Sequence, residues 1–338
     1  MRSATFIMLF FYGSIAAAAD TYADWPAYMK GNGFSCPGPF DTLEKPREVV
    51  LAGKTYSHTG YRMEVSNPDA DDKVVVGIVS AVKDVSEGTR KNFAEAVAWF
   101  KKAGAEWLVV NGDIALNEFD LQAVAEMLGE SGLPTLVVLG NSESKGSWAR
   151  VYRDLAAKYP NLINGVWVRQ IVADDIEFWT LGGYHDRAFV HEGAACMYKE
   201  KDINVMLETL EPAGKGPLAL VSHGPPLGKG KAALDRIVDK KNVGDPLLNR
   251  LIDKRKIPIG IFGHILEAGG AAVGRDQKSA RRSGRDYGDL HINAGSISGD
   301  PWGMNDGSTA FGMAVLLTVQ KGKARYEVKR FAMTPMLD

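Results

Sequence analysis

The chain has 338 residues, a formal net charge of −1 and two cysteines, Cys36 and Cys196. Near-zero charge argues against a general role in binding nucleic acid or membrane surfaces, and two distant cysteines do not make a disulfide framework. In an exported protein they form either one disulfide or remain two buried thiols. The length suits one large α/β domain or two small ones.

The first 19 residues have the pattern of an export signal. Arg2 precedes an apolar run over residues 4–12, and alanines at 16–19 precede Asp20. A charged start, a short apolar run and small residues at a cleavage point predict a signal peptide. The alternative is a membrane anchor, for which the run is short. No later run approaches about 18 apolar residues, so we expect no membrane span after signal removal and a periplasmic or extracellular location.

Residues 20–73 are predicted to form an N-terminal extension. Aromatic and turn-forming residues dominate 20–45, and 49–65 alternates polar and apolar residues. That alternation predicts a small hairpin or two edge strands.

The regular part of the chain begins at residue 74. Continuous apolar runs predict buried strands, and apolar residues at helical spacing predict helices between them. The predicted order is strand 74–79, helix 89–103, strand 107–110, helix 121–128, strand 135–139 and helix 148–158. This β-α-β-α-β order favours parallel strands with right-handed crossovers.

The alternation of strands and helices changes after residue 160. Asp174 and Asp175 are a hairpin signal between two predicted strands. The remaining elements are strands 166–171, 176–181, 218–221, 259–262, 290–293, 312–319 and 324–331, and helices 201–210 and 247–253. Residues 267–287 form a glycine-rich, basic loop. We therefore expect one α/β domain of mixed sheets over 74–331, followed by a tail over 332–338.

Four predicted strands are each followed by a polar residue that adjoins a glycine. These residues are Asp113, Asn141, His223 and His264. In α/β sheets ligands bind outside the carboxyl ends of strands, so these side chains are predicted to converge.

In this order the four motifs resemble the calcineurin-like metallophosphoesterase family. Its pattern is Asp-x-His, Gly-Asp, Gly-Asn-His, a lone His and Gly-His-x-His. The resemblance covers about residues 74–319 and includes Asn293-Ala294-Gly295-Ser296, which is similar to the family's late Asn-x-Gly-Ser turn. It implies a four-layer α/β/β/α sandwich with two mixed β-sheets. It also implies two divalent metals that clamp a phosphate.

When the family's pattern is compared with this sequence residue by residue, the ligands of one metal are kept and those of the other are replaced. All ligands of one metal are present, namely Asp113, Asn141, His223 and His264. At the other metal Ala81 and Lys83 replace the Asp and His of Asp-x-His, and Leu266 replaces the last His. Ser142 stands where the family has its catalytic His. Neutral, non-ligating side chains cannot hold a cation and a Lys repels one.

We therefore expect one divalent metal (Mn, Fe or Zn) and no two-metal centre. The alternative is that the four residues are buried hydrogen-bonding groups of a decayed site.

Several neighbouring residues have two interpretations. Lys83 either pairs with Asp113 in place of the missing cation or points to solvent. Arg281 and Arg282, in a basic loop expected near the site, either bind an anion or are simply solvated. Glu143 and Ser144 either line the pocket or cap the next helix.

A further group, His185, Asp186 and His191, has possible ligand spacing, although such a loop is more often structural.

The leading hypothesis is an exported phosphoesterase-fold protein that has lost two-metal hydrolysis and binds an anionic small molecule or a protein partner. The alternative is a single-metal phosphoesterase that uses Lys83 and the basic loop for charge stabilisation. A structural surface module that depends on the aromatic segment 20–45 is a third class, which the sequence does not test.

Overall fold

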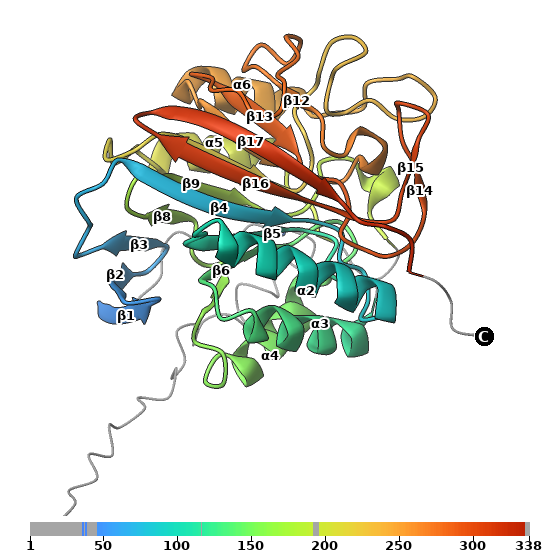
Figure 1. The fold of residues 1–338 in the computed structure, drawn as a ribbon. Helices are drawn as coiled ribbons and strands as arrows, with labels where there is room; N and C mark the ends of the chain where they lie inside the picture. Colours follow the sequence, from blue (N-terminus) through green and yellow to red (C-terminus); the bar gives the residue numbers. More distant parts are fainter. Residues whose placement is uncertain (1–35, 37, 39–45, 116, 192–195, 335–338) are drawn as a thin grey trace, which may run out of the picture.

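The computed structural model describes residues 36, 38, 46–115, 117–191 and 196–334. They form a mixed α/β fold with two large mixed β-sheets and one small two-stranded sheet (Figure 1). No helix in this part of the chain is long and apolar enough to cross a membrane. The predicted signal peptide, most of 20–45 and residues 335–338 lie outside the described residues.

The first large sheet has six strands in the order β17-β16-β4-β5-β6-β7. Neighbours from β4 to β7 are parallel, while β16 is antiparallel to both β4 and β17. The bounds are β4 Lys73–Val79, β5 Trp107–Asn111, β6 Thr135–Val138, β7 Leu162–Asn164, β16 Met313–Gln320 and β17 Lys323–Arg330.

The second large sheet has nine strands in the order β1-β2-β3-β8-β9-β10-β11-β13-β12. Its central strands β9, β10, β11 and β13 are parallel. The bounds are β1 Arg47–Leu51, β2 Lys54–Thr59, β3 Arg62–Val65, β8 Gln170–Val172, β9 Glu177–Leu181, β10 Leu218–Ser222, β11 Ile259–Phe262, β12 Ala272–Val273 and β13 Leu290–Asn293. The small sheet pairs β14 Trp302–Gly303 with β15 Thr309–Ala310.

The helices begin at residues whose chemistry favours a helix start. Ser86 accepts a hydrogen bond from the backbone N–H of Thr89 ahead of α2, and Asp245 caps α6, which starts with Pro246. The bounds are α2 Glu87–Lys102, α3 Glu118–Glu130, α4 Lys145–Leu155, α5 Glu200–Thr209 and α6 Pro246–Arg255, with 3-10 turns η1 Arg187–Phe189 and η2 Leu266–Ala268.

The apolar core follows the alternation of side chains along the strands. On β4, Val75 and Val79 belong to a cluster with side chains of α2, α3 and α4. Val76 and Ile78 point the other way, into a cluster made by both large sheets. A third cluster joins the nine-stranded sheet to α5 and α6. Figure 1 shows α2, α3 and α4 on one side of the sheets and α5 and α6 on the other.

The N-terminal strands extend the large sheet. Where the sequence predicts a hairpin or two edge strands, β1, β2 and β3 pair in series, and β3 joins β8 in parallel. Residues 47–65 are thus continuous with the nine-stranded sheet.

One predicted strand, 166–171, is wrong in its bounds. The chain forms β7 and β8 with a turn between them, because the side-chain oxygen of Asn164 accepts from the backbone N–H of Val166. The same oxygen accepts from Trp148 Nε1, which ties the turn to α4.

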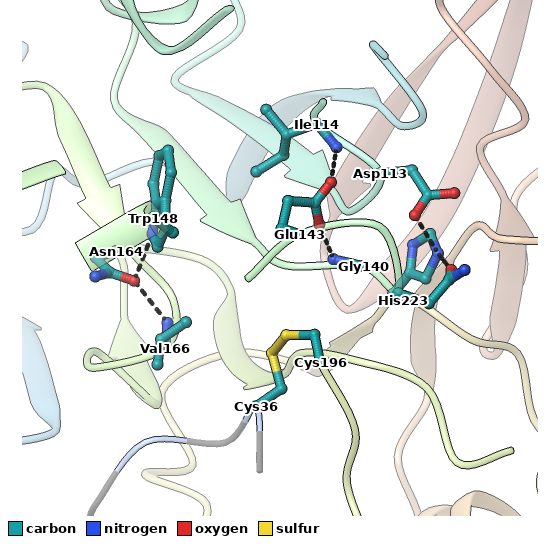
Figure 2. Close-up of a disulfide and its surroundings, with 11 residues drawn as sticks. Cys36, Asp113, Ile114, Gly140, Glu143, Trp148, Asn164, Val166, Cys196 and His223 are labelled. Atoms are coloured by element: carbon teal, nitrogen blue, oxygen red, sulfur yellow. Dashed lines mark hydrogen bonds and ion pairs between the residues drawn. A yellow bond between two sulfur atoms is a disulfide. The ribbon is translucent and has the colours of Figure 1, made fainter. Parts of the chain in front are cut away.

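Cys36 and Cys196 form a disulfide, which decides between the two predicted alternatives (Figure 2). The backbone N–H of Cys36 also donates to the carbonyl of Met197 at 2.6 Å. Cys36 is thereby fixed to Cys196 and Met197, which lie between β9 and α5.

Candidate metal centre

The four predicted side chains come from both large sheets. Asp113 and Asn141 follow β5 and β6 of the six-stranded sheet, whereas His223 and His264 follow β10 and β11 of the nine-stranded sheet. The strands are parallel within each pair, so each pair of side chains lies at one strand-end edge.

Asn111 joins these two edges. It is the last residue of β5 and is fully buried. Its amide Nδ2 donates to the carbonyl of Ser222 at 2.9 Å and to that of Ile261 at 3.3 Å. A buried side chain of one sheet thus satisfies two backbone carbonyls of the other and fixes the sheet edges against each other.

Glycines in the motifs allow the close approach. A Cβ on Gly112 would lie 2.2 Å from His223 Nδ1, and a Cβ on Gly140 would lie 2.5 Å from Asp113 Oδ1. A Cβ on Gly263 would lie 2.4 Å from Ser80 Oγ. The glycine in each motif is therefore required by space.

The potential ligand atoms face one another across short distances. Asn141 Oδ1 lies 2.8 Å from His223 Nε2 and 2.9 Å from His264 Nδ1. His223 Nε2 lies 3.2 Å from Asp113 Oδ1, as Figure 2 shows. The potential ligand atoms of Asp113, His223 and His264 all lie within 4.8 Å of one another. The structure thus brings the four predicted residues together.

Hydrogen bonds fix which atoms face the centre. Asn141 Nδ2 donates to the carbonyl of Phe189 at 2.6 Å, so its Oδ1 is turned inward. His223 Nδ1 lies 3.0 Å from the carbonyl of Asn111 and serves as the donor there, which leaves the Nε2 lone pair facing inward. A histidine that donates its second ring nitrogen to a backbone carbonyl is typical of metal ligands.

Acceptors that face each other at these distances need a cation or a proton between them. Burial opposes protonation of His223, but the carboxylate of Asp113 outweighs burial and raises the pKa of the imidazole. Burial alone would raise the pKa of the Asp113 carboxyl. His223 outweighs burial, so the pKa of Asp113 lies well below its usual range. Burial and the charge of His223 lower the pKa of His264 to about 3, so its ring is neutral and keeps a lone pair. The centre attracts positive charge.

The spacing also fits a metal ion. A tetrahedral ion with bonds of about 2.1 Å separates its ligand atoms by about 3.4 Å. The three observed separations, 2.8, 2.9 and 3.2 Å, would have to lengthen by about 0.6, 0.5 and 0.2 Å to reach that value. A carboxylate, an amide oxygen and two imidazoles suit Mn, Fe or Zn.

Glu143 holds the two loops of the six-stranded sheet in place. Its carboxylate accepts from the backbone N–H groups of Ile114 and Gly140, as Figure 2 shows, and from that of Ala115. Burial, followed by the charge of Asp113, raises its pKa to about 7. Of the two predicted interpretations, Glu143 supports the site from behind and does not cap α4, whose N-cap is Ser144.

The sequence profile of the calcineurin-like phosphoesterase family matches residues 57–268. The chain belongs to the calcineurin-like phosphoesterase family. No curated protein matches it by sequence.

The chain is similar to several solved structures. One aligns with a TM-score of 0.56 at 16% identity, over 77% of this chain and 100% of the other. The protein TT1561 of Thermus thermophilus aligns at 0.47, with 14% identity, over 70% and 94%. A dimetal phosphatase from Danio rerio aligns at 0.45, with 12% identity, over 77% and 99%. The first likeness shows the fold, and the predicted mixed α/β class with two mixed sheets is confirmed.

The positions that differ from the family pattern lie beside the four ligands. Ala81 is fully buried, and its backbone N–H donates to the carbonyl of Gly112. Leu266 is buried at the start of η2. Ser142 Oγ donates to Asp113 Oδ1 at 2.9 Å, so the residue in place of the family's catalytic His holds the carboxylate.

Lys83 does not adopt the predicted pairing with Asp113. Its ammonium lies 4.8 Å from the centroid of the Trp302 ring, and the described residues include no ion pair between Lys83 and Asp113. Only the backbone connects them, through the Lys83 N–H and the Asp113 carbonyl at 3.2 Å. The charge is therefore held at the rim of the site by an indole ring.

Left-handed backbone is concentrated at this site. Ala81, Lys83, Asp113 and His264 have φ of 46°, 69°, 52° and 62°. Such a conformation costs a non-glycine residue roughly 1–2 kcal/mol, and it is often retained where function requires it. These four residues come from both halves of the site.

The basic loop lies at the opposite end of the sheets, which corrects its predicted place near the site. β12 runs antiparallel to β13, so the chain leaves the strand-end edge after residue 273. Tyr287 then bridges Ala324, whose ladder leads through Val319 to Val74 at the start of β4. The seven residues of β4 separate this region from the site by roughly 20 Å.

Arg281 has local partners at that end. Its guanidinium pairs with Asp289 and lies 4.8 Å from the Tyr287 ring. The backbone N–H of Arg282 donates to the Tyr287 hydroxyl. Neither arginine is placed to bind an anion at the metal centre.

The His185 loop borders the centre. The backbone N–H of His191 donates to the carbonyl of Asn141 at 3.2 Å, and the His191 side chain is exposed. His185 lies against the Tyr184 ring at 4.5 Å. Among described residues, the groups with metal-binding geometry include neither histidine.

The other such group joins Asp69, Asp174 and Asp175. Lys54 already pairs with Asp69 at 2.9 Å and with Asp174 at 2.8 Å, which neutralises charge that a cation would meet.

Sequence reasoning missed two aromatic neighbours of His264. Its ring lies 3.9 Å from the Tyr184 ring and 5.7 Å from the Phe189 ring. Tyr184 directly follows Gly182-Gly183 at the end of β9, the same strand-end signal that marked the four ligands, but a tyrosine there was not counted as a site residue.

Proposed function

We propose that this protein is an exported metallophosphoesterase-fold protein that binds one divalent metal and a phosphate-bearing ligand and has lost two-metal hydrolysis. The observation that carries the proposal is the contrast between two halves of one site. Asp113, Asn141, His223 and His264 bring potential ligand atoms to separations of 2.8, 2.9 and 3.2 Å. At the positions that would hold a second metal stand Ala81, Leu266 and a Lys83 turned toward Trp302.

The first half has the properties of a resident metal site. Its inward atoms are oriented by bonds to Asn111 and Phe189. When bound, a divalent metal acts as a Lewis acid toward a phosphate oxygen. The chain's own contribution is to fix the ligand atoms and to supply a net negative charge through Asp113.

The second half supports the loss of two-metal chemistry. The side chains of Ala81 and Leu266 have no lone pair that could bind a metal. Both residues are buried, so solvent or a neighbouring ligand cannot easily take their place. Ser142 is engaged with Asp113 and is far too weak an acid to replace an imidazole near neutral pH. A ligand- or partner-binding role follows, with an anionic small molecule or a protein as the occupant.

A single-metal phosphoesterase is the second candidate, and one observation favours it. The Asp113 side chain is 12% exposed, so solvent reaches the edge of the centre. One metal with an open position is sufficient for some hydrolases. The charge that this candidate would take from Lys83 and the basic loop has less support, since Lys83 faces Trp302 and Arg281 lies at the far end.

Metal analysis of the purified protein tests the proposal. We expect one equivalent of Mn, Fe or Zn per chain, and His223→Gln to weaken binding by about 100-fold or more. His58→Gln is the matched control, because His58 is also buried but bonds to Arg47 and Gly60 away from the centre. Two tightly bound metals per chain would overturn the proposal.

An activity panel of phosphomonoesters and phosphodiesters separates the two candidates. Turnover in the usual enzyme range, about 1 per second or faster, that disappears in His223→Gln would establish the single-metal phosphoesterase. Metal binding without such turnover supports the binding role.

Export is proposed from residues 1–19 and is supported by the Cys36–Cys196 disulfide, since disulfides persist in oxidising compartments. N-terminal sequencing of protein recovered from the producing cells tests it. A mature chain that begins near Asp20 is expected, and a cytoplasmic chain that begins at Met1 would contradict it.

A further inference from the structure

The exposed aromatic side chains of the described residues gather at one edge of the molecule. Three are exposed: Phe119, Phe189 and Trp302. They follow the carboxyl ends of β5, β9 and β13, and the metal centre lies at that same edge. Two of them, Phe189 and Trp302, contact residues of the site, and exposed aromatic rings beside a polar site indicate a binding surface.

Trp302 borders the half of the site that lacks metal ligands. It lies in β14, is 38% exposed, and carries the Lys83 ammonium 4.8 Å from its ring centroid. The backbone of Lys83 is bonded to that of Asp113, so this indole and this charge are tied to the centre. A cation and an aromatic plane are thus presented together beside a metal ligand.

Phe189 borders the other half. Its ring is 38% exposed and meets the His264 ring edge-on at 5.7 Å, while its carbonyl holds Asn141. Phe119 differs from both, because none of its contacts given by the structure reaches a site residue. The centre therefore has one aromatic ring on each flank, and each is fixed to a metal ligand through a defined contact.

We propose that the site selects phosphate esters whose alcohol portion carries an aromatic ring. The phosphate binds at the metal centre, the Lys83 ammonium faces the anion, and the ring stacks on Trp302 or packs on Phe189. The inference rests on the proposed metal and phosphate site and adds the class of ligand. Stacking of a planar ring on an exposed aromatic side chain strengthens binding by about tenfold or more.

Calorimetry on the Mn²⁺-loaded protein tests the inference with three probes: inorganic phosphate, methyl phosphate and phenyl phosphate. We expect phenyl phosphate to bind about tenfold more tightly than methyl phosphate. Trp302→Ala is expected to reduce this ratio toward one. Phe119→Ala, the matched control on the same edge, is expected to leave the ratio unchanged. Lys83→Ala is expected to weaken all three probes and to preserve the ratio.

The possible outcomes separate this inference from the proposed function. If Mn²⁺ does not bind, both are overturned. If Mn²⁺ and inorganic phosphate bind but phenyl and methyl phosphate bind equally, only the aromatic selectivity is overturned. A ratio that falls as much in Phe119→Ala as in Trp302→Ala would also overturn it, because the effect would then not come from the ring at Lys83.

Two sources could supply such a ligand, a nucleoside monophosphate or a phosphorylated tyrosine. They share an anion and a planar ring but differ in ring size and in the sugar between them. Parallel titrations with 5′-AMP and O-phosphotyrosine distinguish them, and binding of either more tightly than methyl phosphate supports the inference.

Discussion

Gly140→Ala offers the sharpest test of how the metal centre is built. Gly140 follows β6 and directly precedes the ligand Asn141. A Cβ at this position would lie 2.3 Å from the backbone nitrogen of Asp113, 2.5 Å from its Oδ1 and 3.0 Å from His223 Cε1. The Gly140 backbone is not in the left-handed region, so the added methyl acts through space alone.

The magnitude follows from those distances. An ordinary contact for a Cβ begins near 3.4 Å, so Asp113 must move by roughly 1 Å. Overpacking of a close-packed interior costs about 1–3 kcal/mol, and we expect the upper half of that range because a backbone atom is among the obstacles. The displaced carboxylate no longer faces His223 and Asn141, so metal affinity is expected to fall at least about tenfold.

The assay is urea denaturation of metal-free protein, followed by circular dichroism, with calorimetric metal titration on the same preparations. Gly288→Ala is the matched control, because a Cβ there meets nothing within 4 Å and φ is not left-handed. Its stability should stay within about 0.5 kcal/mol of wild type. If Gly140→Ala unfolds at the wild-type urea concentration and binds metal normally, the close-approach argument is refuted.

Two further predictions concern stability. Replacing both Cys36 and Cys196 with Ser should lower the free energy of unfolding by roughly 2–5 kcal/mol, measured by urea denaturation. Reduced wild-type protein should match the variant. Unchanged stability in the variant would contradict a formed disulfide. Burial lowers the pKa of His291 to about 4, and its neutral ring bonds to Gln277 and Ile257. The stability from the neutral ring is present above about pH 6.5 and is lost as pH falls toward 4, by up to about 1.4 kcal/mol per pH unit. His291→Gln should therefore flatten the acid limb of a curve of unfolding free energy against pH. An equally steep limb in the variant would count against this prediction.

The sequence by itself determined most of the elements and the four candidate ligands. Apolar runs and helical spacing predicted most strands and helices to within a few residues, because burial on one or both faces imposes those periods. The motifs with Asp113, Asn141, His223 and His264 were visible because each glycine marks a place where a side chain has no room. Family resemblance then gave the four residues a common role.

Only the tertiary structure decided how the site is completed. The ligands come in pairs from two sheets, and the bonds of Asn111 that join those sheets are long-range contacts without a local pattern. Lys83 lies over Trp302, more than two hundred residues later in the chain, because a charge at the rim finds an aromatic face there.

The position of the basic loop could not be predicted from the sequence either. Its sequence position just after His264 suggested a place at the site, but the short antiparallel strand β12 carries the chain to the far end of the sheet. Strand direction is set by pairing with β13, which lies later in the chain and is invisible to a local pattern. Composition and periodicity therefore fixed what each segment is, and pairing between distant segments fixed which charges and rings surround the metal centre.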